Sequence, residues 1–169
     1  MNEYVKLAKY SLEYFIRNGE IAPFPNDVSA ELTANKAGVF VCIKIRGQLR
    51  GCIGTIVPVT ENIAYEIMRN AVSAASEDPR FPPVTVGELD ELVYTVDVLK
   101  PPEIIDGISQ LDVKKYGVIV TSGRKRGLLL PNLDGVDTVE QQVSIAANKA
   151  GICEGETVQF ERFEVVRHE

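Results

Sequence analysis

The chain has 169 residues, of which 45% are hydrophobic and 25% charged, and its formal net charge is −6. A chain of this size buries about two thirds of its unfolded surface without covalent staples, and the composition argues against disorder. The acidic balance opposes broad attraction to nucleic acid, and three cysteines without a C-x-x-C spacing beside a single histidine predict no metal site.

The first half of the chain predicts a helix, a hairpin, a second helix and a strand. Residues 3–18 carry apolar side chains at helical spacing, with Asn2 as the N-cap and Gly19 as the terminating residue. Residues 38–57 contain two β-rich runs around Arg46-Gly47-Gln48, which predict a hairpin. Residues 61–76 then form an amphipathic pattern, and residues 92–99 alternate as a strand.

The second half predicts the same elements in the same order. Residues 117–131 form a hairpin around residues 122–125, and a helix over 138–150 opens with Asp137 and Glu140 as a capping box. Residues 157–166 close as a strand. Arg50-Gly51 falls opposite Arg126-Gly127, so the order indicates an internal duplication; the alternative is a chance recurrence of a common hairpin and helix. The fold class predicted is α+β, with a mainly antiparallel sheet and flanking helices.

The stretch from Leu49 to Thr55 places two glycines and an arginine inside a strand. Glycine weakens a strand interior, so this pattern suggests a bulge or a backbone that another group approaches closely. A turn centred on Gly47 keeps the aliphatic face continuous, with Ile45 facing Leu49, Lys44 opposite Arg50, and Cys42 opposite Cys52. A turn between Gly47 and Gln48 would put Arg50 on the aliphatic face, where an unpaired charge is costly, so the first register is preferred.

This strand carries the main site hypothesis. Lys44 and Arg50, with the backbone amides around Gly51 and Gly54, would bind an anion beside a thiol. The two cations would lower the pKa of the Cys52 thiol and make Cys52 a catalytic nucleophile. In the alternative interpretation, Cys42 and Cys52 are small hydrophobic residues buried under a helix.

Two further segments are candidates for binding. Three prolines in residues 77–84 fix a loop that can hold Asp78 and Arg80 in place for a ligand; alternatively, Asp78 pairs with Arg50 or Arg80 as a structural contact. The turn at residues 122–127 puts three cations on a hairpin tip, which could touch phosphate or simply be solvated. Acidic residues such as Glu88 are interpreted as solvated surface, and no adjacent acid is evident for Arg50.

Four segments in order resemble motifs of the AMMECR family, the A component of the bacterial and archaeal AmmeMemoRadiSam system: residues 49–55, 78–83, 127–131 and 149–151. The resemblance implies one α+β domain over 1–169, with a larger subdomain that contains both termini, a smaller inserted subdomain, and a cleft between them. It implies neither a mechanism nor a cofactor. The chain departs from the family where relatives carry a cysteine, at Ala147-Asn148, and in having no tryptophan.

These observations give one leading function hypothesis and two alternatives. The leading one is a small anionic or nucleotide-like ligand bound in the cleft by Lys44, Arg50, Asp78 and Arg80 beside Cys52, in one version by an enzyme of a modification pathway. The second is a non-catalytic adaptor that docks a radical-SAM or Memo-like partner. The third, RNA binding, is disfavoured by the acidic balance. Without a secretion signal or a run of about 18 apolar residues, a cytoplasmic protein is expected.

Overall fold

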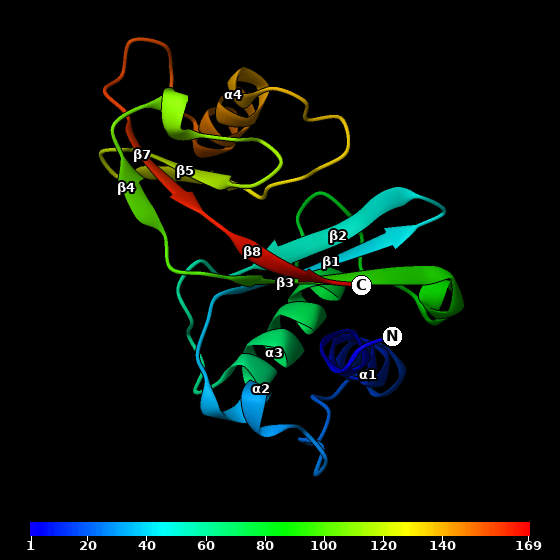
Figure 1. The fold of residues 1–169 in the computed structure, drawn as a ribbon. Coiled ribbons are helices and arrows are strands. Elements are labelled where there is room, and N and C mark those ends of the chain that lie inside the picture. The colour runs from blue at the N-terminus through cyan, green and yellow to red at the C-terminus, as the bar shows by residue number, and fades with distance from the viewer. The chain divides into compact units, whose positions relative to one another are not determined.

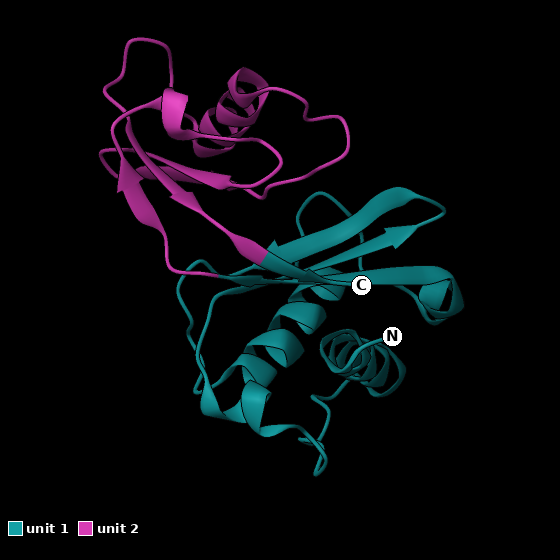
Figure 2. Cartoon of the chain, in the orientation of Figure 1, with its two compact units in different colours: residues 1–99, 166–169 teal, residues 100–165 magenta.

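The computed structural model describes residues 1–169 and divides into two compact units. Unit 1 comprises residues 1–99 and 166–169, so it contains both termini, and unit 2 comprises residues 100–165 (Figure 2).

Unit 1 is a four-stranded sheet with helices packed on one face. The strands are β1 (Val39–Ile45), β2 (Gln48–Gly54), β3 (Leu92–Leu99) and β8 (Val165–His168), in the order β2-β1-β3-β8. The helices α1 (Glu3–Asn18) and α3 (Ile63–Ser76) lie side by side against this sheet, and the short α2 (Ala30–Ala34) contacts α3 (Figure 1). We call the helix-covered face the inner face and the opposite one the outer face. On the inner face of β1, Val39, Val41 and Ile43 are buried, whereas Phe40, Cys42 and Lys44 on the outer face are half-buried.

Unit 2 has the same plan with one helix. Its strands are β4 (Glu103–Ile105), β5 (Gly117–Ser122), β6 (Lys125–Leu129) and β7 (Gln159–Phe163), in the order β4-β7-β5-β6, and α4 (Val139–Ala150) packs on β5 and β6. Two short 3₁₀ helices complete the chain, η1 (Val86–Glu91) in unit 1 and η2 (Ile108–Gln110) in unit 2. None of the helices has both the length and the apolar composition that crossing a membrane requires.

The two sheets have matching topologies, which supports the predicted duplication. Read from the hairpin edge, the orders are β2-β1-β3-β8 and β6-β5-β7-β4, and in each unit the helix follows the hairpin and precedes the third strand. The two sheets exchange their fourth strands along the chain. After β3 of the first sheet the chain continues into β4 of the second sheet, and after β7 of the second sheet it returns to β8 of the first. The predicted α+β class with antiparallel sheets is confirmed.

The predicted element ends are confirmed at the first helix and wrong at two later places. The Asn2 side chain accepts a hydrogen bond from the Val5 amide at 3.1 Å, and Gly19 ends α1 with φ 71°. The capping box of α4 consists of Thr138 and Gln141, one residue after the predicted pair. The strand predicted over 157–166 is interrupted after Phe163, because β7 and β8 belong to different sheets.

Candidate functional site

The hairpin of β1 and β2 confirms one half of the predicted register and corrects the other. Cys42 lies opposite Cys52, as predicted. The turn, however, is the pair Arg46-Gly47, whose φ values of 51° and 77° suit the two-residue turns that join twisted strands. Ile45 therefore faces Gln48, and Lys44 faces Leu49 rather than Arg50. The predicted pairings of Ile45 with Leu49 and of Lys44 with Arg50 are wrong.

The register shifts between Ile43 and Lys44, which leaves Arg50 as the extra residue of a β-bulge. A bulge releases its residue from the regular alternation of a strand, and Arg50 is only 9% exposed. Its Nε and Nη2 atoms donate to the Glu88 carboxylate at 2.8 and 3.1 Å. Glu88 was predicted as solvated surface and Arg50 as lacking an adjacent acid; both predictions are wrong.

Glu88 reaches Arg50 because η1 begins with a capping box. The Thr85 hydroxyl and amide both donate to the Glu88 carboxylate, which fixes this side chain at the start of η1. The hydrogen bond from Arg50 lowers the pKa of Glu88 to about 2. Most of the Arg50 guanidinium is thus committed to a structural ion pair, and its role as a ligand contact stays a prediction.

The two glycines of this strand make room for other parts of unit 1. A Cβ atom on Gly51 would lie 2.2 Å from the Ala74 carbonyl oxygen of α3, and one on Gly54 would lie 2.2 Å from the Phe40 ring. The close approach predicted from the glycines is therefore that of a helix and an aromatic ring. Their role in binding an anion stays a prediction.

Asp78 and Arg80 together hold the peptide of Cys52. The Asp78 side chain accepts the Cys52 amide at 3.0 Å and the Arg80 Nε and Nη2 atoms at 3.0 and 2.8 Å. Arg80 Nη2 also donates to the Cys52 carbonyl at 3.4 Å. Since β2 is the edge of the sheet, this loop satisfies the backbone groups that a further strand would otherwise pair. Asp78 therefore pairs with Arg80, one of the two partners considered from the sequence.

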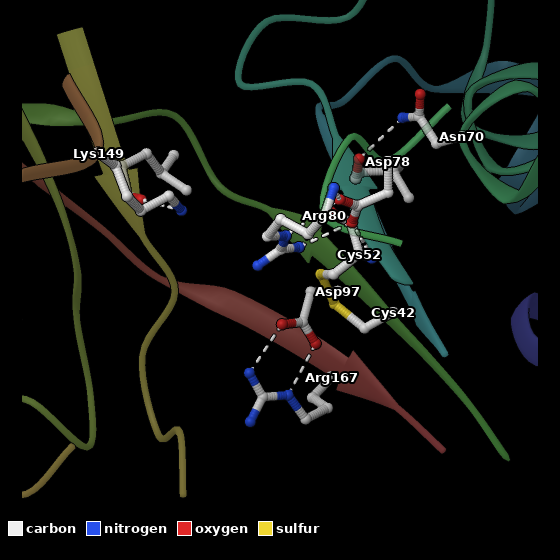
Figure 3. Close-up of a disulfide and its surroundings, with 10 residues drawn as sticks. Cys42, Cys52, Asn70, Asp78, Arg80, Asp97, Lys149 and Arg167 are labelled. Atoms are coloured by element: carbon white, nitrogen blue, oxygen red, sulfur yellow. Dashed lines mark hydrogen bonds and ion pairs between the residues drawn. A yellow bond between two sulfur atoms is a disulfide. The ribbon is translucent and has the colours of Figure 1, made fainter. Parts of the chain in front are cut away.

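The electrostatics of this clamp leave one group facing solvent. The Asp78 side chain is 2% exposed, and the hydrogen bond from Arg80 lowers its pKa to about 2. The Arg80 side chain is 51% exposed, and its Nη1 atom has no hydrogen-bond partner in the chain. Figure 3 shows the Arg80 guanidinium drawn together with the cysteine pair and Asp78. The clamp thus presents a fixed cation at the edge of the sheet.

Cys42 and Cys52 are joined by a disulfide (Figure 3). A sulfur in a disulfide is not a thiolate, so the predicted nucleophilic role of Cys52 applies only to the reduced pair and stays a prediction. Cys153, the remaining cysteine, is free and exposed in unit 2.

Sequence reasoning missed an ion pair on the outer face of the same sheet. Arg167 of β8 donates through Nε and Nη2 to Asp97 of β3 at 2.8 and 2.7 Å, and Asp97 is buried. Asp97 lies opposite Phe40, so it shares the outer face with Cys42. The sequence feature that could have revealed this ion pair is Asp97 itself, an acidic residue in a strand whose other residues carry no charge.

A buried carboxylate in α3 was also missed. Glu66 is fully buried and accepts hydrogen bonds from the Thr55 and Thr60 hydroxyls and the Val59 and Thr60 amides, at 2.6 to 2.7 Å. Burial alone would raise the pKa of Glu66, but these hydrogen bonds lower it. The carboxylate shapes the loop between β2 and α3. The sequence feature that could have revealed this buried carboxylate is the place of a charged residue on the same helix face as Ile63 and Ile67.

The basic hairpin tip of unit 2 is largely neutralised. Lys125 pairs with Glu156 at 3.1 Å, and Arg126 lies 3.7 Å from Glu161. Two of the three cations predicted to form a basic tip are therefore bound to carboxylates.

Fold and site together define an α+β protein of two similar hairpin, helix and strand units, of which the first carries a cysteine pair held by an aspartate and an arginine. The AMMECR1 family profile matches residues 5–168, and the chain belongs to this family. A protein of Thermotoga maritima is 52% identical over 167 residues, which cover 98% of this chain and 96% of that protein.

Two further relatives show the range of the family. The protein CA_C1420 of Clostridium acetobutylicum is 54% identical over 98% of this chain, but the matching segment is only 35% of its own length. The crystal structure of uncharacterized protein PH0010 from Pyrococcus horikoshii superposes with a TM-score of 0.87 at 33% identity, covering 97% of this chain and 88% of that one. The fold of the chain is therefore that of a solved relative.

Proposed function

We propose that the chain binds a small anionic or nucleotide-like ligand beside the Cys42–Cys52 pair, with Arg80 as the central contact, and that it acts in the cytoplasm. The half-exposed guanidinium of Arg80, fixed by Asp78, carries the proposal. Guanidinium groups recognise carboxylates and phosphates through directed N–H donors. Because Asp78 already orders the Arg80 side chain, ligand binding costs little conformational entropy at this residue.

Lys44 supports the same proposal from the neighbouring strand. It lies on the outer face of β1, two residues beyond Cys42, which places it about 7 Å further along the strand. In this proposal a ligand with two anionic groups, such as a diphosphate, contacts both cations. If the protein is an enzyme, Cys52 in its reduced form is the nucleophile that we propose.

A thermal-shift screen of phosphate, pyrophosphate, nucleotides and dicarboxylates tests this function. A ligand at a hundredfold excess over its dissociation constant stabilises the folded state by about 2.7 kcal/mol. Arg80→Ala should abolish that shift, and Arg124→Ala, which removes an exposed cation of unit 2, should leave it intact. A shift that survives Arg80→Ala would contradict the proposal.

The relative from Clostridium favours a second candidate function. In that protein the matching domain makes up 35% of a longer chain, so there it works joined to another polypeptide segment. As this second candidate we propose a non-catalytic adaptor, with a radical-SAM or Memo-like protein of an AmmeMemoRadiSam system as partner. Titration calorimetry of this chain against the purified remainder of the Clostridium protein tests this function. Binding that Arg80→Ala weakens, without any small-molecule stabiliser, would favour the adaptor.

A further inference from the structure

The Cys42–Cys52 bridge joins two strands that are already held together without it. β1 pairs over its whole length with β3 and over most of it with β2. The turn at Arg46-Gly47 fixes the hairpin, and Asp78 and Arg80 hold both backbone groups of Cys52. When the bridge is opened, the two sulfurs should therefore stay neighbours.

Unit 2 provides an internal control for this position. Gly51 lies opposite Ile43 in unit 1, and the corresponding Gly127 lies opposite Val120 in unit 2. The pair that stands where Cys42 and Cys52 stand is then Ile119 and Leu128, both buried. Unit 2 forms the same hairpin with an apolar pair and no covalent bond. The fold therefore does not require a bridge at this position.

The surroundings of the pair suit exchange with a small thiol. Both cysteines are half-buried on the outer face, so a small molecule can approach them. The guanidinium of Arg80 is hydrogen-bonded to the Cys52 carbonyl, and a neighbouring cation stabilises a thiolate. Asp97 is paired with Arg167, and Asp78 is paired with Arg80 itself, whose Nη1 atom has no hydrogen-bond partner in the chain.

We propose that Cys42 and Cys52 form a reversible dithiol–disulfide site that exchanges with small thiols of the glutathione class, with Arg80 stabilising the Cys52 thiolate. A thiolate of the small molecule attacks one sulfur, the bridge breaks, and the other cysteine leaves as a thiolate. A second small thiolate attacks the mixed disulfide and releases the small disulfide. Two electrons pass from the two small thiols to the bridge, and the two cysteine thiolates take up protons from water.

The first test uses the Cys153→Ser protein, which retains only the two cysteines of the site. It is equilibrated in mixtures of reduced and oxidised glutathione, quenched with acid, and its thiols are counted by labelling with a maleimide polymer. Reduced glutathione in large excess should open about nine tenths of the bridge, and oxidised glutathione should close it again, with an unchanged circular dichroism spectrum. A bridge that opens only in denaturant overturns the proposal, and so does a pair that stays reduced in oxidised glutathione.

The second test assigns the reactive sulfur and the role of Arg80. Single-cysteine proteins with Cys42→Ser or Cys52→Ser, in the Cys153→Ser background, are reacted with a small aromatic disulfide across a pH range. The Cys52 thiol should react faster than the Cys42 thiol and titrate at lower pH. Arg80→Ala should raise its pKa and slow it about threefold, since lower thiolate content is partly offset by higher nucleophilicity. Arg80→Lys should retain the rate. Equal rates for the Cys52 thiol with Arg80, with Arg80→Ala and with Arg80→Lys would overturn the role of Arg80.

Discussion

In both units a glycine of the second hairpin strand lies directly under a helix carbonyl. A Cβ on Gly51 would stand 2.2 Å from the Ala74 oxygen, and one on Gly127 would stand 2.0 Å from the Ala146 oxygen. Each helix also carries a buried side-chain amide that donates to a backbone carbonyl at the beginning of the first hairpin strand. Asn70 donates to the carbonyl of Val39, the first residue of β1, and Gln142 donates to that of Tyr116, the residue before β5, both at 2.9 Å.

A third contact recurs at the edge strand. Arg80 donates to the carbonyl of Cys52, and Lys149 donates to the carbonyl of Leu128 at 3.0 Å. Cys52 and Leu128 each follow the packing glycine of their unit. Three recurring contacts therefore define a shared scaffold, in which glycine, buried amide and cation hold helix and hairpin together.

The units differ at the residues that carry chemistry. Unit 1 has a cysteine pair where unit 2 has Ile119 and Leu128. In unit 1 the arginine before the packing glycine, Arg50, lies in a β-bulge and forms an ion pair with Glu88. The corresponding Arg126 sits in regular register and is 42% exposed. Contacts common to both units, including the bonds of Arg80 and Lys149 to a strand carbonyl, serve packing. The cysteine pair and the half-exposed guanidinium that Asp78 holds occur in unit 1 and are the better candidates for function. This places the search for activity on unit 1.

The largest expected effect concerns the two packing glycines. Gly51→Ala and Gly127→Ala should each destabilise the fold by about 3 kcal/mol, because the added methyl group meets a backbone oxygen that cannot move alone. Denaturant unfolding measures the change. Gly87→Ala in unit 1 and Gly107→Ala in unit 2 are matched controls, since nothing lies within 4 Å of a Cβ at either position. A harmless Gly127→Ala would break the equivalence of the two units.

The buried amides should follow with a smaller effect. Asn70→Ala removes one donor from the Val39 carbonyl, which keeps the Thr55 amide, and we expect a loss of about 1 kcal/mol. Gln142→Ala removes the side-chain donor of the Tyr116 carbonyl, and we expect a loss of about 2 kcal/mol. The same unfolding measurement, with exposed Asn26 in unit 1 and exposed Asn148 in unit 2 changed to alanine as controls, checks both values. If only one of the pair destabilises the chain, the two helices are not held in the same way.

Local pattern predicted the elements of this fold because caps and turns are encoded within a few residues. Asn2 and Gly19 bound α1 as expected. The pairing of Cys42 with Cys52 was predicted correctly from a turn centred on Gly47 that is itself wrong, because the bulge restores the predicted register beyond Arg50. The position of the bulge could not be read this way, because a two-residue turn shifts the register and the extra residue is then absorbed at Arg50.

The site was predicted only in part, since its partners come from distant segments. Glu88 lies 38 residues from Arg50 and becomes its partner through the capping box of η1. Arg167 reaches Asp97 across 70 residues because β8 joins the first sheet. Such pairings depend on tertiary topology, whereas the Asp78–Arg80 contact spans two residues and was already considered from the sequence.

Acid should affect unit 1 before unit 2. The pKa values of Asp78 and Glu88 are lowered from 3.8 and 4.5 to about 2, so the stability they contribute is present above about pH 4.5 and lost as the pH falls toward 2. After allowance for solvent screening, we expect about 1 kcal/mol for each carboxyl group. Unfolding curves between pH 7 and 2.5 measure the loss, which Asp78→Asn and Glu88→Gln should each reduce.

Hydrogen exchange at the same pH values locates this effect. In unit 2 the carboxyl group with a lowered pKa is Glu156, on the surface beside Lys125. Amides of β2 should therefore lose protection at a higher pH than amides of β6. Simultaneous loss in both hairpins would contradict the assignment of acid sensitivity to unit 1.

The smallest effect concerns the strand that closes unit 1. His168 of β8 stacks on Tyr4 with ring centroids 3.7 Å apart, and its Nδ1 atom lies 3.0 Å from the side-chain Nδ2 atom of Asn2. Burial lowers the pKa of His168 below 6.5, although Glu31 and Asp97 act in the opposite direction. The unfolded chain then binds the proton more tightly, so stability should fall as the pH drops below about 6.5, by less than about 1 kcal/mol.

His168→Phe keeps an aromatic ring for the stack but cannot titrate, and it should remove the dependence of stability on pH between pH 5 and 7. Because His168 is the only histidine in the chain, a dependence that survives this change would show that β8 is not the pH-sensitive contact of unit 1.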